Sequence, residues 1–278
     1  MDQKKKMLIS LLPSYLEIYK PLFESWDLST NEIKRLLIKY QAAAHIQERL
    51  TRLEKWHMCF YGERNYPIGL YRCSRPPYRI LSDKPLAPYI APFALTGSHF
   101  PYEEGDEASM GLSYSLCVNG QMTATSGYGR CGWNVMKMAA QTESPCLRVV
   151  GKGLDYIVKR RWVTTISPFE PHMRPVKNCS GVQVVGLLTG ISQSLIVFQA
   201  QRNSLCYHAA VAALDIGENV YVHCCGADAR EKCNGSKLLF DNGAPLIASY
   251  QDLARYEHLA HFYQVKKRGD LWEKVAFT

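Results

Sequence analysis

The feature of this sequence that most constrains its fold is a set of three short apolar segments between residues 93 and 155, each followed by a glycine-containing loop. The segments with their loops span 93–99, 122–132 and 147–153. Helices are expected between them, at about 103–117 and 133–140, and Asn119-Gly120 ends the first of these as a C-cap. Strands that alternate with helices in this way predict the first half of a doubly wound α/β sheet.

The rest of the chain continues this alternation of strands and helices. Further strands are expected at 162–166, 194–198, 220–222 and 246–247, and further helices at 181–190, 204–216, 235–242 and 250–262. The stretch Leu195–Phe198 is continuously apolar, which is typical of a parallel strand buried on both faces. The sequence therefore predicts an α/β protein with a Rossmann-like, doubly wound, mostly parallel sheet over residues 92–253. The remaining 254–278 would hold a helix end and a short basic tail.

An N-terminal helical region is expected over residues 1–61. One helix is predicted at about 7–24. A second begins at the capping box Ser29–Glu32 and is predicted to run to about Trp56. A helix pair that packs on the next domain is the simpler interpretation, and a DNA-binding helical module is the alternative.

A proline-rich connector is expected at 62–91. Because prolines recur throughout it, we expect neither long helices nor interior strands there. Four arginines and three tyrosines are interleaved in the same stretch: Arg64, Arg72, Arg75, Arg79, Tyr66, Tyr71 and Tyr78. Two interpretations fit. The tyrosines could pack inside the protein while the arginines face water, or both could contact a nucleic-acid strand.

Composition limits the class of protein. The 278 residues carry a formal net charge of +8, which is compatible with a polyanionic partner but does not prove one. No run of about 20 apolar residues is present, and no cleavage site follows the first apolar run, so we expect no membrane span and a cytoplasmic location. Ten cysteines occur, but the cluster His223-Cys224-Cys225 with Cys233 does not match common zinc spacings. No bound metal is expected.

The glycine loops predict a phosphate-bearing ligand, because glycine lets backbone N–H groups approach a phosphate closely. Residues 127–132 spell G-x-G-x-x-G, but the ribose-binding acid of a dinucleotide site has no good candidate downstream. A nucleotide hydrolase with this fold would need a catalytic glutamate, and 133–140 contain no acid. Cys206 and His208 are two residues apart and point to different faces of a helix. We therefore expect no catalytic residue and no cofactor.

Seven motifs in order resemble the bacterial DNA-processing protein A family. They cover roughly residues 62–253. The matching stretches are 62–67 with 75–78, Thr96–His99, Ser126–Arg130, Val149–Asp155, Ile166–Pro171, Gly190–Ser192 with 196–200, and Asn234–Leu239 with 241–244.

Four departures from the family pattern indicate a divergent member. His99 stands where the family has the arginine of G-S-R, and Cys131 and Trp133 replace a glycine and an aspartate. The family has an R-N-R motif before a helix. An alignment without a gap places this motif at 184–186, and an alignment with a small insertion places it at Lys177-Asn178. Its S-G-x-L-I-T-A helix start is kept only at Ser204, Ala209 and Ala210.

The resemblance implies a binding protein and no enzyme. Members bind single-stranded DNA in a basic pocket at the strand ends, form homodimers, and help load RecA recombinase onto DNA taken up in natural transformation. The residues implied for DNA binding here are Gly97, Ser98, His99, Ser126, Gly127, Arg130, Gly151, Lys152, Gly153, Lys177, Asn178 and Ser204. Two alternatives stay open: a Rossmann-like nucleotide-binding hydrolase, and an interaction protein that has lost DNA binding.

Overall fold

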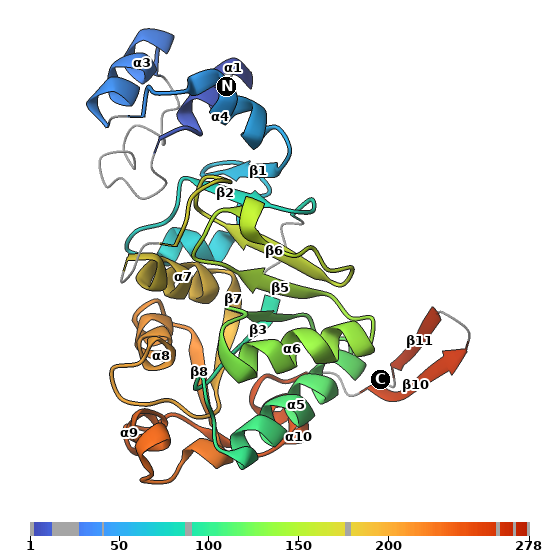
Figure 1. Cartoon of the computed structure of the whole chain (residues 1–278). Coiled ribbons are helices and arrows are strands. Elements are labelled where there is room, and N and C mark those ends of the chain that lie inside the picture. The colour runs from blue at the N-terminus through green and yellow to red at the C-terminus, as the bar shows by residue number, and fades with distance from the viewer. Residues whose placement is uncertain are drawn as a thin grey trace.

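A nine-stranded sheet forms the centre of the computed structural model (Figure 1), which describes residues 3–12, 28–40, 42–86, 91–175, 179–259, 262–268 and 271–276. The strand order is β1-β2-β6-β5-β4-β3-β7-β8-β9. Pairing is parallel from β6 to β9, and antiparallel for β1–β2 and β2–β6. The strands are β1 His57–Phe60, β2 Arg79–Ser82, β3 Ala91–Thr96, β4 Thr123–Thr125, β5 Cys146–Val149, β6 Val163–Ser167, β7 Ser192–Val197, β8 Asn219–His223 and β9 Leu246–Ile247.

Helices cover both faces of this sheet (Figure 1). They are α5 Glu103–Val118, α6 Gly129–Gln141, α7 Cys179–Gly190, α8 Leu205–Asp215, α9 Asn234–Asp241 and α10 Tyr250–Tyr256. Helices α1 Gln3–Ile9, α3 Thr30–Lys39 and α4 Ile46–Leu53 gather beyond β1, at one end of the sheet (Figure 1). Alternate residues of β7 face opposite layers, since Leu195 and Val197 pack in one apolar core and Ile196 in the other. The predicted doubly wound, mostly parallel α/β architecture is confirmed, and each strand and helix predicted between residues 93 and 256 is present.

The sheet reverses its winding between β3 and β7, which are neighbours at its centre. The chain leaves β3 toward β4 on one side and leaves β7 toward β8 on the other. Gln199, which is fully buried just after β7, joins the neighbouring loops at this point by hydrogen bonds. Its Oε1 accepts a hydrogen bond from the Tyr102 amide at 2.8 Å, and its Nε2 donates to the Cys225 carbonyl at 3.2 Å. Ligands of such sheets bind in the crevice at this switch point.

The N-terminal region differs from its prediction in two places. The capping box of Ser29 and Glu32 is present, but α3 ends at Lys39 and a separate helix starts at Ile46. The prediction of a single helix from the capping box to Trp56 is therefore wrong. The Arg49 guanidinium binds the carbonyls of Ala42 and Ala44, and His45 adopts a left-handed backbone with φ of 52°. These contacts hold the chain between the helices in a turn. The helix predicted at 7–24 starts earlier and ends at Ile9, and 13–24 lie outside the described residues.

The connector contributes a strand to the sheet interior, contrary to expectation. Strand β2 lies between β1 and β6. The prolines of the stretch precede or follow β2, so its N–H groups remain able to pair. The tyrosines pack rather than face solvent: Tyr66 and Tyr78 are buried, and Tyr61, Tyr66 and Tyr71 form an edge-to-face cluster. Tyr66 and Tyr78 are therefore not available to stack on a nucleic-acid base.

The C-terminal part holds more regular structure than predicted. Helix α10 ends at Tyr256, and β10 (Phe262–Arg268) and β11 (Leu271–Ala276) pair as an antiparallel hairpin where a basic tail was expected. Among the described residues, no helix has the length and apolarity needed to cross a membrane.

Candidate functional site

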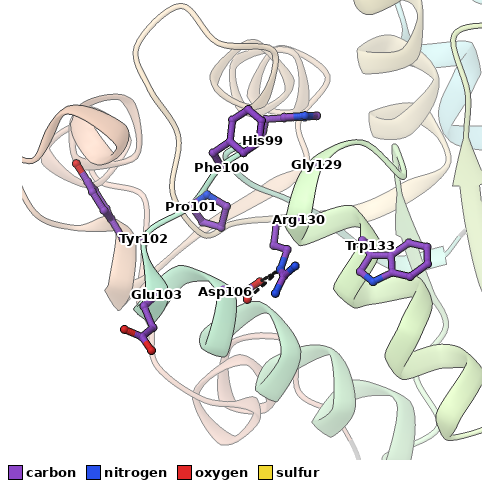
Figure 2. A pocket seen from close by; sticks show the side chains of 9 residues that line it. All are labelled: His99, Phe100, Pro101, Tyr102, Glu103, Asp106, Gly129, Arg130 and Trp133. Atoms are coloured by element: carbon purple, nitrogen blue, oxygen red, sulfur yellow. Dashed lines mark hydrogen bonds and ion pairs between the residues drawn. The ribbon is translucent and has the colours of Figure 1, made fainter.

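A pocket of about 700 Å³ opens at the carboxyl ends of β3 and β4 (Figure 2). The loop after β3 and the first turns of α5 and α6 form its walls. The lining residues are His99, Phe100, Pro101, Tyr102, Glu103, Asp106, Gly129, Arg130 and Trp133.

The two walls of the pocket come together because Gly129 has no side chain. A Cβ on Gly129 would lie 2.6 Å from the His99 Cα, and its φ of +68° is one that other residues rarely adopt. The Arg130 amide donates to the His99 carbonyl at 3.2 Å across this contact. Arg130 and Trp133 are three residues apart on α6, and Glu103 and Asp106 on α5, so each pair projects from one face of its helix.

Arg130 and Asp106 form an ion pair inside the pocket (Figure 2). The Arg130 Nε lies 3.0 Å from both carboxylate oxygens, and Asn134 donates to Oδ1 at 2.6 Å. Partial burial opposes ionisation of Asp106, but these hydrogen bonds outweigh it and hold the pKa of Asp106 below its usual value. The bonds to Asp106 come from the Arg130 Nε, and the Arg130 side chain is 60% exposed.

Several expected backbone donors are used within the protein. The Ser98 amide donates to the Gln199 carbonyl at 2.5 Å, and the Gly153 amide donates to the Met173 carbonyl at 2.7 Å. The Gly127 amide donates to Thr125 Oγ1 at 3.3 Å. These three amides therefore do not point at a phosphate, which corrects the expected role of their N–H groups.

The glycines of these loops instead allow close packing. A Cβ on Gly97 would lie 3.3 Å from the Cys131 Cβ, one on Gly127 would lie 2.7 Å from the Arg148 side chain, and one on Gly153 would lie 2.1 Å from the Pro171 carbonyl oxygen. Arg148 itself is largely buried and donates to Thr165 Oγ1 from both Nε and Nη2. Burial, with the nearby Arg160 charge, lowers the pKa of Arg148.

The remaining predicted residues are spread along the sheet edge. His99 and Arg130 line the pocket, whereas Gly151 and Lys152 follow β5 and are not among its lining residues. Ser126 accepts a hydrogen bond from the Tyr128 amide, and Ser204 caps α8 by accepting one from the Tyr207 amide. Lys177 and Asn178 lie outside the described residues.

The structure adds pocket residues that the sequence analysis did not predict to bind DNA. Phe100 and Tyr102 follow His99 in the same loop, whereas Asp106 on α5 and Trp133 on α6 meet through the packing of the two helices. Cations lie on two of these rings: Arg160 is 4.7 Å from the Trp133 ring centroid, and Arg230 is 4.3 Å from that of Tyr102. Trp133 had appeared in the sequence analysis only as the residue that replaces the aspartate of a family motif.

Three thiols surround the base of the glycine loops. Burial raises the pKa of Cys131, Cys206 and Cys225, and Cys206 Sγ donates to the Gly97 carbonyl at 2.9 Å. Such thiols stay protonated at neutral pH and lack the thiolate that a nucleophile needs. Within the part of the chain that the structure describes, no three metal-binding side chains gather as a metal site.

The sequence matches no family model and no curated protein. Two solved structures are similar in fold. DNA processing protein A from Streptococcus pneumoniae matches with a TM-score of 0.75 and 17% identity, over 91% of this chain and 96% of that one. A structure on the single-stranded DNA binding mode of DNA processing protein A from Helicobacter pylori matches with a TM-score of 0.62 and 17% identity, over 73% and 96%. The resemblance read from the motifs is thus confirmed at the level of structure: the chain has the fold of DNA processing protein A.

Proposed function

We propose that this chain is a divergent DNA-processing protein A that binds single-stranded DNA at the pocket of Figure 2. The observation that carries the proposal is the position of the pocket: it lies beside the switch point of this fold and holds the exposed Arg130 side chain beside exposed rings. Open α/β sheets bind their ligands at this place. The Helicobacter pylori protein with the same fold binds single-stranded DNA.

The pocket has groups that suit a sugar–phosphate chain. The Arg130 guanidinium is oriented by Asp106, which reduces the entropy lost when it binds a phosphate. Helix α6 begins beside it without a side-chain cap, so its positive N-terminal end faces the same space. These contacts read no bases, so binding is proposed to be independent of sequence.

The wider role that we propose is that of the family. The chain would protect incoming DNA and help load RecA recombinase during natural transformation and recombination, as a cytoplasmic homodimer and without catalysis. Two observations support binding without catalysis: Asp106 is held as an ion pair, and the thiols near the loops are kept protonated by burial. The role is tested by RecA filament assembly on DNA coated with single-strand-binding protein, with and without this chain.

DNA binding is tested first by fluorescence anisotropy of labelled oligo-dT, titrated with the chain across a salt series and with duplex as competitor. We expect binding to oligo-dT that duplex does not displace, and weaker binding by Arg130→Gln. Tyr114→Phe, an exposed change on α5 outside the pocket lining, is the control. Absence of binding at low salt would overturn the proposal and favour an interaction protein that has lost DNA binding. Hydrolysis of nucleotides by the chain would favour the hydrolase alternative.

A further inference from the structure

Two aromatic rings at the pocket are unusually exposed. Phe100 is 72% exposed and Trp133 is 45% exposed, and both line the pocket on either side of Arg130 (Figure 2). Large apolar side chains in water, gathered at a hollow with polar neighbours, mark an interaction site. Neither ring contributes to the buried cores of the sheet.

Both rings are held in place while keeping surface in water. The Arg160 guanidinium lies over the Trp133 ring at 4.7 Å from its centroid, which covers one face. Phe100 makes an edge-to-face contact with the His99 ring, with centroids 4.5 Å apart and planes at 81°. A flat ligand that stacks on such rings loses little side-chain entropy, because the rings are already oriented.

The charge of the pocket argues that phosphate contacts are not its main source of affinity. Its lining residues include one arginine, Arg130, and two acids, Glu103 and Asp106. With His99 neutral, the lining therefore has a formal charge of −1. Three further cations lie on rings of the lining: Arg160 on Trp133, and Arg230 and Lys232 on Tyr102. Arg230 is paired with Glu104 and Asp228, and with these groups counted the formal charge comes to zero. A pocket without positive excess needs another way to hold a polyanion.

Resting on the DNA-binding function proposed above, we infer that Phe100 and Trp133 are stacking platforms for two unpaired nucleobases, and that stacking supplies most of the binding energy. Stacking of a base on an aromatic ring strengthens binding by about 5-fold or more and tolerates any base. Base faces are available in a single strand and covered in a duplex. The rings would thus provide the preference for single strands. The pocket cannot provide it through positive charge, because it has no positive excess.

The test compares oligo-dT with an oligonucleotide of the same length made of abasic units, which keeps the phosphates and removes the bases. Wild-type chain should bind oligo-dT at least about 10-fold more tightly than the abasic strand. Phe100→Leu and Trp133→Leu should each weaken oligo-dT binding about 5-fold or more and leave abasic binding unchanged. Phe100→Tyr, which keeps a ring, should bind like wild type. Tyr114→Leu, exposed on α5 outside the pocket lining, is the matched control.

The outcomes separate the inference from the function on which it rests. If the wild-type chain binds oligo-dT and abasic strand equally, or if the leucine variants bind oligo-dT like wild type, DNA binding stands and base stacking is wrong. If the wild-type chain binds neither strand at low salt, the proposed function fails and the inference fails with it. Circular dichroism of each variant checks that these surface changes leave the fold intact.

Discussion

At the scale of single residues, Arg130 shows what a motif can and cannot predict. The motif 126–130 identified it as a cation at a strand end, and the structure places it in the pocket. Its partner Asp106 lies 24 residues earlier, on another helix, and no local spacing connects them. Likewise, Ser98 and Gly153 were correctly placed in loops, but their amides donate to carbonyls from other strands and loops. Sequence patterns predict local conformation, whereas hydrogen-bond partners across helices depend on packing.

Removing the Asp106 charge should strengthen DNA binding. In Asp106→Asn, the new side chain still accepts a hydrogen bond from Asn134, while Arg130 loses its counter-charge. One charge removed within a few ångströms of a phosphate is worth about 1 kcal/mol, so oligo-dT affinity at low salt should rise about 5-fold. The salt dependence should become steeper. Glu107→Gln, an exposed neighbour that does not line the pocket, changes net charge equally and should have little effect in the same anisotropy titration.

At the scale of elements, the sequence was most informative where hydrophobic pattern and glycine loops agreed. The strands and helices predicted from 93 to 256 are present because most of the strands are buried on both faces and helices such as α5 and α9 end beside an Asn-Gly pair. The last helix was predicted to run to 262 and ends at Tyr256. The misses have physical causes. The break between α3 and α4 is held by Arg49, and β2 pairs inside the sheet because the prolines near it precede or follow the strand. The contacts of Arg49 depend on folding, whereas the proline-free stretch 78–84 that holds β2 could have been seen in the sequence.

Helix α5 offers a paired test of its packing, because it contains two glycines in different surroundings. A Cβ on Gly105 would lie 2.5 Å from the buried Gln199 side chain that braces the switch point, whereas one on Gly111 meets no atom within 4 Å. Gly105→Ala should lower the free energy of unfolding by about 1–3 kcal/mol, through overpacking. Gly111→Ala should raise it by up to about 1 kcal/mol, because alanine favours helix. Urea unfolding measures both, and equal effects of the two substitutions would contradict this packing.

At the scale of the whole molecule, the connector and the N-terminal helices pack against the sheet domain. The contacts between them join residues far apart in the chain, so they could not be predicted from the sequence. Tyr78 in the connector donates to the carbonyl of Ile9 at 2.6 Å. The turn at Ile68–Arg72 packs against the end of α7, where a Cβ on Gly69 would lie 2.5 Å from the Gly190 carbonyl oxygen. The N-terminal helices and the connector, which composition suggested were separate from the sheet domain, thus share one apolar core with the sheet.

The contact between Glu218 and Arg72 of the connector makes the stability of the protein depend on pH. Its side chain is fully buried, with Arg72 of the connector at 3.3 Å, and burial raises the pKa of Glu218 to about 8 although Arg72 opposes the rise. Because the folded pKa exceeds the ordinary value of 4.5, the stabilising contribution is full below pH 4.5 and is lost as pH rises through 8. The melting temperature of wild type should therefore fall by a few degrees more between pH 5 and 9 than that of Glu218→Gln. Exposed Asp215→Asn, the control, should follow wild type.

Arg49 links the N-terminal helices to the sheet domain through a largely buried ion pair. Its guanidinium binds both carboxylate oxygens of Glu170 and the Leu11 carbonyl at 2.6 Å, and the two charged side chains are only 13% and 15% exposed. Arg49→Ala leaves a buried carboxylate without its partner and should lower the free energy of unfolding by about 3–5 kcal/mol in urea titrations. It should also expose the N-terminal helices to limited proteolysis. Arg52→Ala is the control, because Arg52 is 40% exposed and 3.4 Å from Asp155, and it should lower the free energy of unfolding far less than Arg49→Ala does. Equal losses for the two variants, or unchanged proteolysis of Arg49→Ala, would show that apolar packing alone holds the helices in place.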